Sequence, residues 1–154
     1  MLVEAFEQKH YEAVIAMTRR NMNESFPHLD YNESKARYEA DNALRCGGGM
    51  AAFIAVHNEE VIGYLMASAV EHAFADGKVV SLRLFYVRPE SRGTSAAFRL
   101  MLAFKEFTRL LGAVETHVGV TSGFHTEQAR TFFEKLGYNY VGPLLMMKGT
   151  NNEN

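Results

Sequence analysis

The first 49 residues carry their apolar side chains mainly at helical spacing. Four residues at positions i, i+3, i+4 and i+7 predict a helix over 8–20: Tyr11, Val14, Ile15 and Thr18. A weakly alternating stretch over 2–6 predicts a short strand before this helix. Asp30 and Glu33 have the spacing of a capping box and predict the start of a second helix over 31–45. Three consecutive glycines are expected to end that helix.

From residue 50 onward the pattern changes to short apolar runs that are typical of strands. The runs 50–56 and 61–70 are separated by a short polar segment, and together they predict a β-hairpin. Further along, strand-like and helical patterns alternate: strand 79–87, a helix through 97–111, strand 114–120 and a helix through 129–136. Two short apolar runs over 138–148 predict a final hairpin or bent strand. The Leu144–Met147 part of the last segment is expected to lie in the core.

The predicted element order is β-α-α-β-β-β-α-β-α-β-β, which indicates a mixed α/β sheet with helices on its faces. The strand–helix–strand unit over 79–120 requires a parallel, right-handed crossover, while the other strands can pair antiparallel. We predict one domain over 1–150 and a disordered tail at 151–154.

Composition narrows the class of protein. The chain has 154 residues, of which 47% are hydrophobic and 22% charged, with a formal net charge of −2. These values fit one globular domain and exclude a disordered or collagen-like chain. A near-neutral balance argues against nucleic acid as a partner, since dedicated binders carry a strongly basic face.

Cys46 is the only cysteine, which excludes an intrachain disulfide and a cysteine-based zinc site. We expect no metal and a reducing compartment. The N-terminus lacks the apolar core of a signal peptide, and the longest apolar run, 61–70, is too short to cross a bilayer. The sequence therefore predicts a cytoplasmic protein without a membrane partner.

The turn after strand 79–87 has the composition of an anion-binding site. Pro89 ends the strand, Arg92 and Gly93 make the turn, and small residues over 94–97 occupy the first helical turn. Small side chains leave the first helical N–H groups accessible, and the helix dipole adds positive potential there. Such a helix start binds phosphate, and an arginine adds charge-assisted hydrogen bonds. Simple packing of the turn is the alternative interpretation.

The same turn resembles the pyrophosphate-binding motif of the GNAT acyl-CoA N-acyltransferases, which is Arg/Gln-x-x-Gly-x-Gly/Ala after a strand. The matching residues are Val87-x-Pro89-x-x-Arg92-Gly93-x-Ser95-x-Ala97, followed by Leu100. Ser95 replaces the central glycine of the motif. A second block is similar to the C-terminal signature of the family: Ala129-x-x-Phe132-Phe133-Glu134-Lys135-Leu136-Gly137-Tyr138. Ile62-Gly63-Tyr64 matches the family's third strand, and the resemblance covers 50–148.

The resemblance implies a GNAT-like fold: a mixed, mostly antiparallel sheet of six to seven strands, about four helices and a splayed parallel pair in the middle. It implies an N-acetyltransferase that moves an acetyl group from acetyl-CoA to a primary amine of a small molecule or protein by direct attack. The alternative is a catalytically weak or inactive acyl-CoA-binding or interaction protein of the same fold. A homodimer is possible in either case.

The resemblance also assigns roles to residues. Those expected to bind coenzyme A are Phe85, Tyr86, Val87, Arg92, Gly93, Thr94, Ser95, Ala96, Ala97, Thr126 and Phe133. Phe133 stands where the family has a proton-donating tyrosine, and Arg83 stands where it commonly has a carboxylate base. His117 and Tyr138 are therefore our candidates for acid–base catalysis, with structural roles as the alternative. Arg83, Phe26 and Tyr31 are expected to contact the acceptor, and pairing with a glutamate is the other interpretation of Arg83.

Overall fold

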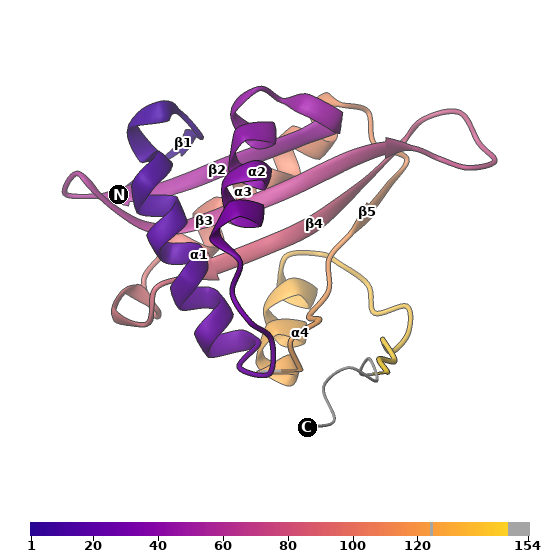
Figure 1. Cartoon of the computed structure of the whole chain (residues 1–154). Helices are drawn as coiled ribbons and strands as arrows, with labels where there is room; N and C mark the ends of the chain where they lie inside the picture. Colours follow the sequence, from indigo (N-terminus) through magenta and orange to yellow (C-terminus); the bar gives the residue numbers. More distant parts are fainter. Residues whose placement is uncertain (124, 148–154) are drawn as a thin grey trace. The chain divides into compact units, whose positions relative to one another are not determined.

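The computed structural model describes residues 1–123 and 125–147 (Figure 1). These residues form two compact units, one over 1–117 and one from residue 118 onward, and each unit is described by itself. A single domain over 1–150 stays a prediction, and the predicted tail at 151–154 lies outside the described residues.

The first unit is built on one five-stranded sheet. Its strands are β1 (Leu2–Ala5), β2 (Met50–His57), β3 (Glu60–Glu71), β4 (Lys78–Val87) and β5 (Glu115–His117). They lie in sequence order, with antiparallel pairing throughout except between β4 and β5, which are parallel. The mixed α/β class is confirmed. Within the described residues the sheet has five strands rather than six to seven, so the parallel pair lies at its edge and not in its middle.

Four α-helices of the described chain accompany the strands: α1 (Tyr11–Ser25), α2 (Glu33–Leu44) and α3 (Ala96–Leu110) in the first unit, and α4 (Thr126–Lys135) in the second. Helix α2 begins later than predicted. Its N-cap is Asn32, whose side-chain oxygen accepts a hydrogen bond from the Lys35 amide at 3.0 Å. The predicted Asp30–Glu33 capping box is therefore wrong, because the asparagine closer to the helix satisfies the free amide instead.

The sheet of the first unit is covered on both faces. Helices α1 and α2 lie in front of it in Figure 1, and α3 lies behind it. The front core joins Val14 of α1 and Ala40 of α2 to the fully buried Ile54 and Tyr64 of the sheet. On the other face, α3 buries its apolar stripe completely: Leu100, Met101 and Phe104. Burial of these stripes is the main source of stability for both layers.

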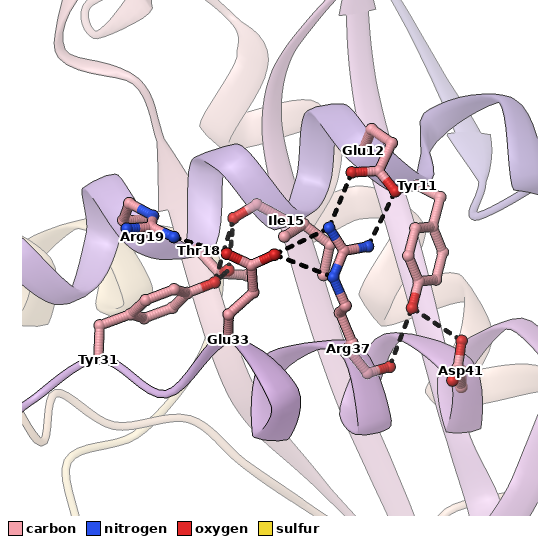
Figure 2. Close-up of polar contacts among 9 residues, drawn as sticks. All are labelled: Tyr11, Glu12, Ile15, Thr18, Arg19, Tyr31, Glu33, Arg37 and Asp41. Atoms are coloured by element: carbon pink, nitrogen blue, oxygen red, sulfur yellow. Dashed lines mark hydrogen bonds and ion pairs between the residues drawn. The ribbon is translucent and has the colours of Figure 1, made fainter.

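A network of charged and hydroxyl groups fixes α2 against α1 (Figure 2). The guanidinium of Arg37 donates two hydrogen bonds to Glu12, at 2.8 and 3.0 Å, and further bonds to Glu33. Arg19 also reaches Glu33, at 2.5 Å. The Tyr11 hydroxyl donates to Asp41 at 2.8 Å. The two helices that flank the segment 26–32 are thus held together by specific polar contacts.

The second unit contains α4, which buries Phe133, and an extended segment over 138–147. The described part of that segment forms no strand, and the side chains of Leu144 to Met147 are 64–93% exposed. The expectation of a final hairpin and of a buried Met-rich run is therefore wrong. An apolar run becomes a buried strand only if it pairs with the edge of a sheet, and the local sequence pattern does not show whether such an edge is available.

Within the described residues, no helix has the length and apolar character needed to cross a bilayer.

Candidate functional site

Strand β4 pairs with β5 only along its first part. The parallel register begins at Val79 with Glu115 and ends at Ser81 with His117, whereas β4 continues to Val87. His117 therefore stands where the parallel pairing stops. Its Nε2 lies 2.8 Å from Oε2 of Glu115, so the two exposed side chains share one face of the strand, as alternation predicts.

The end of β4 is fixed by close contact with β3. A Cβ atom added to Gly63 would lie 2.9 Å from the carbonyl oxygen of Tyr86 and 3.1 Å from Cγ2 of Val87. The Arg88 amide donates to the carbonyl of Ile62 at 3.0 Å, so the contact with β3 continues one residue past the end of β4. Glycine at position 63 therefore permits the backbone approach that places the last residues of β4.

A short turn links β4 to α3. The 3-10 helix η3 (Pro89–Ser91) follows the strand, and Gly93 then adopts a positive φ of 82° that favours glycine. Nε of Arg92 donates to the Val87 carbonyl at 3.0 Å, which anchors the arginine to the end of β4. The Thr94 hydroxyl donates to the Ser91 carbonyl at 2.7 Å and accepts the Ala96 amide at 3.3 Å.

Backbone amides at this turn lack a hydrogen-bond acceptor among the described residues. Among the described residues, the amides of Gly93, Thr94 and Ser95 donate no hydrogen bond to another protein group. A Cβ atom added to Gly93 would meet nothing within 4 Å. The Ser95 hydroxyl accepts a hydrogen bond from Nε of Arg99 at 3.2 Å. Free amides at the start of the fifteen-residue α3 form the arrangement that binds anions.

The guanidinium of Arg92 lies against a carboxylate that sequence spacing did not single out. Nη1 of Arg92 is 2.5 Å from Oε1 of Glu24, in the last turn of α1. The Tyr86 hydroxyl donates to Oε2 of Glu24 at 3.0 Å, and Cζ of Arg92 lies 5.5 Å from the centroid of the Tyr86 ring. Glu24 continues the buried stripe of α1 through Thr18 and Asn21, and this periodicity is the one sequence signal that pointed to it.

These contacts change the acid–base properties of both partners. The Arg92 guanidinium, followed by the Tyr86 hydroxyl, holds the pKa of the Glu24 carboxyl below its usual value, although partial burial opposes this effect. Burial raises the pKa of Tyr86, and the nearby Glu24 raises it further. Glu24 is therefore ionised and Tyr86 protonated at neutral pH.

The three residues expected to contact an acceptor all belong to the first unit. Arg83 is the extra residue of a β-bulge, because Leu84 pairs with Met66 and Leu82 pairs with Ala67. Its Nη1 lies 3.2 Å from Oε2 of Glu39 on α2, in agreement with the alternative interpretation that Arg83 pairs with a glutamate.

The other two residues expected to contact an acceptor lie in the segment 26–32, one at its start and one near its end. Phe26 is the half-buried C-cap of α1. The Tyr31 hydroxyl lies 2.9 Å from Oγ1 of Thr18, and Arg19 stacks over its ring at 4.9 Å from the centroid (Figure 2). Tyr31 thus contributes to the network between α1 and α2, and its contact with an acceptor stays a prediction.

The second unit contains a pocket of about 280 Å³ beside α4. Three residues predicted for the site line it together: Thr126, Phe133 and Tyr138. Thr126 is the first residue of α4, whose N-cap is His125. Phe133 meets the ring of Tyr138 edge-on, with centroids 6.3 Å apart and planes at 76°. The structure therefore groups residues that are separated along the chain by most of a helix.

The Tyr138 hydroxyl is the unusual group of this pocket. It is buried and has no hydrogen-bond partner among the described residues. Burial raises the pKa of Tyr138, so the hydroxyl keeps its proton at neutral pH. A buried hydroxyl normally finds a partner, and one without a protein partner is a candidate for contact with a ligand.

Several solved structures with this fold are acetyltransferases. A probable acetyltransferase matches at 18% identity over 97% of this chain and 99% of the other, with a TM-score of 0.78. Aminoglycoside N-acetyltransferase AAC(6')-Iy, crystallised with the bisubstrate analog CoA-S-monomethyl-acetylneamine, matches at 18% identity over 96% and 97%, with a TM-score of 0.77. A Trypanosoma brucei acetyltransferase matches at 15% identity over 96% and 98%, with a TM-score of 0.75. At such identities these likenesses establish the fold.

No curated protein sequence matches the chain. The family comparison is decisive by contrast, because the model of the acetyltransferase (GNAT) family matches residues 11–138, which is most of the chain. This match includes the turn at Arg92 and the C-terminal block up to Tyr138, the two segments on which the resemblance was based. The predicted acyltransferase class is thereby confirmed, and the chain belongs to the acetyltransferase (GNAT) family.

Proposed function

We propose that this protein is an acetyl-CoA-dependent N-acetyltransferase that transfers an acetyl group to a primary amine of a small molecule or protein. The observation that carries the proposal is the start of α3, where the amides of 93–95, which have no partner in the described part of the chain, adjoin the arginine of a family motif. Aminoglycoside N-acetyltransferase AAC(6')-Iy, of the same fold, was crystallised with CoA, which supports coenzyme A as the ligand of this turn.

The residues at the turn fit a diphosphate. The positive φ of Gly93 and the open space beside it leave room for a phosphate against the backbone. Arg92 supplies the positive charge, and Thr94 has its hydroxyl turned back to Ser91, away from its own amide. By the resemblance, the backbone of Phe85, Tyr86 and Val87 would hold the pantetheine arm, which would then run along the part of β4 that follows its described pairing with β5.

Bound acetyl-CoA supplies an activated thioester to the acceptor amine. The chain must remove a proton from an ammonium group, because an amine with a pKa near ~10 is mostly protonated at neutral pH. His117 is our candidate for this role, and Glu115 at 2.8 Å would hold its ring in place. Tyr138 is the candidate for donating a proton to the departing thiolate, since its hydroxyl is protonated and unpartnered.

Replacement of Tyr138 by phenylalanine is expected to lower kcat about a hundredfold while leaving the melting temperature unchanged or slightly raised. The hydroxyl makes no hydrogen bond to the described protein, so its removal should not destabilise the fold. Loss of a proton donor slows the chemical step by an amount of this order or more. Steady-state rates and thermal unfolding of both proteins measure the two effects, and Tyr140→Phe on the same segment is the control. A loss of stability without a loss of kcat would assign Tyr138 to packing alone.

The second candidate function is an acyl-CoA-binding protein of this family that transfers poorly or not at all. Phe133 cannot donate a proton, and Arg83 is engaged with Glu39 where the family commonly has a base. Both features leave the binding turn intact and weaken the acid–base half of the site.

Two measurements separate the candidates. A thermal shift with CoA and with acetyl-CoA tests binding, because a ligand of the native state must stabilise it. Release of free thiol from acetyl-CoA across a panel of amines, with an aminoglycoside, polyamines, amino acids and a lysine peptide, tests transfer. Binding with release supports the enzyme, binding without any release favours the second candidate, and no shift contradicts both. A cytoplasmic location and a homodimer stay predictions.

A further inference from the structure

The last turn of α1 places a carboxylate on the arginine that the proposed function assigns to the diphosphate. Oε1 of Glu24 lies 2.5 Å from Nη1 of Arg92, and Oε2 accepts the Tyr86 hydroxyl at 3.0 Å. Glu24 is half-buried, so solvent does not fully screen its charge. The Glu24 carboxylate thus already occupies the Arg92 guanidinium to which a phosphate would bind.

The geometry divides the Arg92 side chain into a fixed part and a part that can change partners. Nε donates to the Val87 carbonyl at 3.0 Å and holds the base of the guanidinium at the end of β4. Nη1 carries the ion pair with Glu24. Phosphate and carboxylate both accept charge-assisted hydrogen bonds from arginine, so a phosphate that approaches Nη1 competes with Glu24.

A second ion pair lies beside the one between Arg92 and Glu24. Arg20 pairs with Glu90 at 2.7 Å, next to the Arg92–Glu24 pair. Two positive and two negative groups therefore give no net positive field from these side chains. A diphosphate approaching Arg92 meets the negative charge of Glu24 as well, which opposes its binding.

We propose that Glu24 is a built-in competitor of the diphosphate: it holds Arg92 in the free protein and releases it when coenzyme A binds. This inference rests on the proposed function. The Tyr86 hydroxyl still donates a hydrogen bond to Glu24 after Nη1 of Arg92 has turned to the phosphate, so the carboxylate keeps one partner. Glu24 then lowers the affinity for coenzyme A and speeds the release of coenzyme A after the acetyl group has been transferred.

The opposite role of Glu24 makes the opposite prediction. If Glu24 served only to orient Arg92 for the phosphate, its removal would weaken binding of coenzyme A. If Glu24 competes, its removal strengthens binding and slows release. The sign of the change therefore decides between the two roles.

The test compares wild type with Glu24→Gln by calorimetry with CoA and by stopped-flow release. We expect Glu24→Gln to bind CoA about fivefold more tightly, a change typical of a partly exposed ion pair. Glu90→Gln is the matched control. It removes one negative charge close to Arg92, but Glu90 pairs with Arg20 and not with Arg92. We therefore expect it to change the affinity for CoA less than twofold. The shorter Glu24→Ala must shift affinity in the same direction as Glu24→Gln.

Two further measurements tie the effect to the diphosphate and to Arg92. S-Acetylpantetheine lacks the diphosphate, so its binding should be equal in wild type and Glu24→Gln, which also shows that the variant is folded. In an Arg92→Ala background, most of the gain from Glu24→Gln should disappear, since no guanidinium is left to compete for.

Each outcome bears on the inference in a defined way. Equal or weaker CoA binding by Glu24→Gln, with clear binding by wild type, overturns the inference and leaves the proposed function intact. Equal gains for Glu24→Gln and Glu90→Gln also overturn it, because the effect would then be one of general charge. Absence of CoA binding by wild type and both variants overturns the proposed function together with the inference.

Discussion

Replacement of Arg92 by glutamate is expected to weaken CoA binding about a hundredfold. The change removes charge-assisted hydrogen bonds to phosphate, which are the strong class of such bonds, and sets a negative charge against the diphosphate. It also leaves Glu24 beside a second carboxylate instead of its present guanidinium partner at 2.5 Å. Calorimetry with CoA measures the loss, which a hundredfold change converts to roughly 2.7 kcal/mol of binding free energy.

The control is Arg109→Glu, which makes the same charge change at the other end of α3. Arg109 pairs with Glu106 one turn earlier on an exposed face and has no role in the proposed site. Its CoA affinity should stay within about twofold of wild type, because screening removes the effect of distant exposed charges. Unchanged affinity in Arg92→Glu, or equal losses in both variants, would show that the diphosphate does not bind at the start of α3.

The second large effect is expected for stability, at the junction between α2 and the sheet. Gly49 has a φ of +73°, and a Cβ atom added there would overlap the carbonyl oxygen of Ala69 in β3. Because that contact is with backbone, a change of rotamer cannot relieve it. Gly49→Ala should lower the free energy of unfolding by about 3 kcal/mol or more. This value combines the cost of the left-handed conformation for alanine with the cost of relieving the overlap with Ala69.

Its neighbour offers a matched control. Gly48 also has a positive φ, +61°, but a Cβ atom added there would meet nothing within 4 Å. Gly48→Ala should therefore show only the conformational penalty, about 1–2 kcal/mol. Chemical denaturation of the three proteins measures the differences. If both variants lost the same stability, the proximity of Ala69 would be irrelevant and the strand pairing around Gly49 would have relaxed without cost.

Elements with a strong local pattern agreed closely between sequence and structure. The helical stripe of α3, the hairpin of β2 and β3, and strand β4 follow from periodicities that extend over several residues. The boundaries that failed depend on one competing side chain, as at Asn32, which caps α2 in place of Asp30. The segment 138–147 failed because a strand exists only with a partner, and local pattern does not specify the partner.

The candidate site divides in the same way. The turn from Val87 to Ala97 is local, so its glycine and small residues, together with the resemblance to the family motif, allowed an anion site to be predicted there. Glu24 reaches Arg92 from another helix, and the bulge that makes Arg83 the extra residue of β4 depends on the register with β3. Contacts of this kind arise when distant segments pack, and one sequence carries only a weak trace of them.

By itself, the sequence determined that this chain forms a mixed α/β sheet, because the elements follow from residue periodicity. The phosphate-binding turn at the start of α3 was predicted from the resemblance to the acetyltransferase family and stays a prediction. The tertiary structure alone decided which charges meet there. It placed Glu24 and Tyr86 around Arg92 and left the hydroxyl of Tyr138 buried without a hydrogen-bond partner among residues 1–123 and 125–147. Such electrostatic relations depend on distances of a few ångströms between remote residues, which are set only when the helices pack on the sheet.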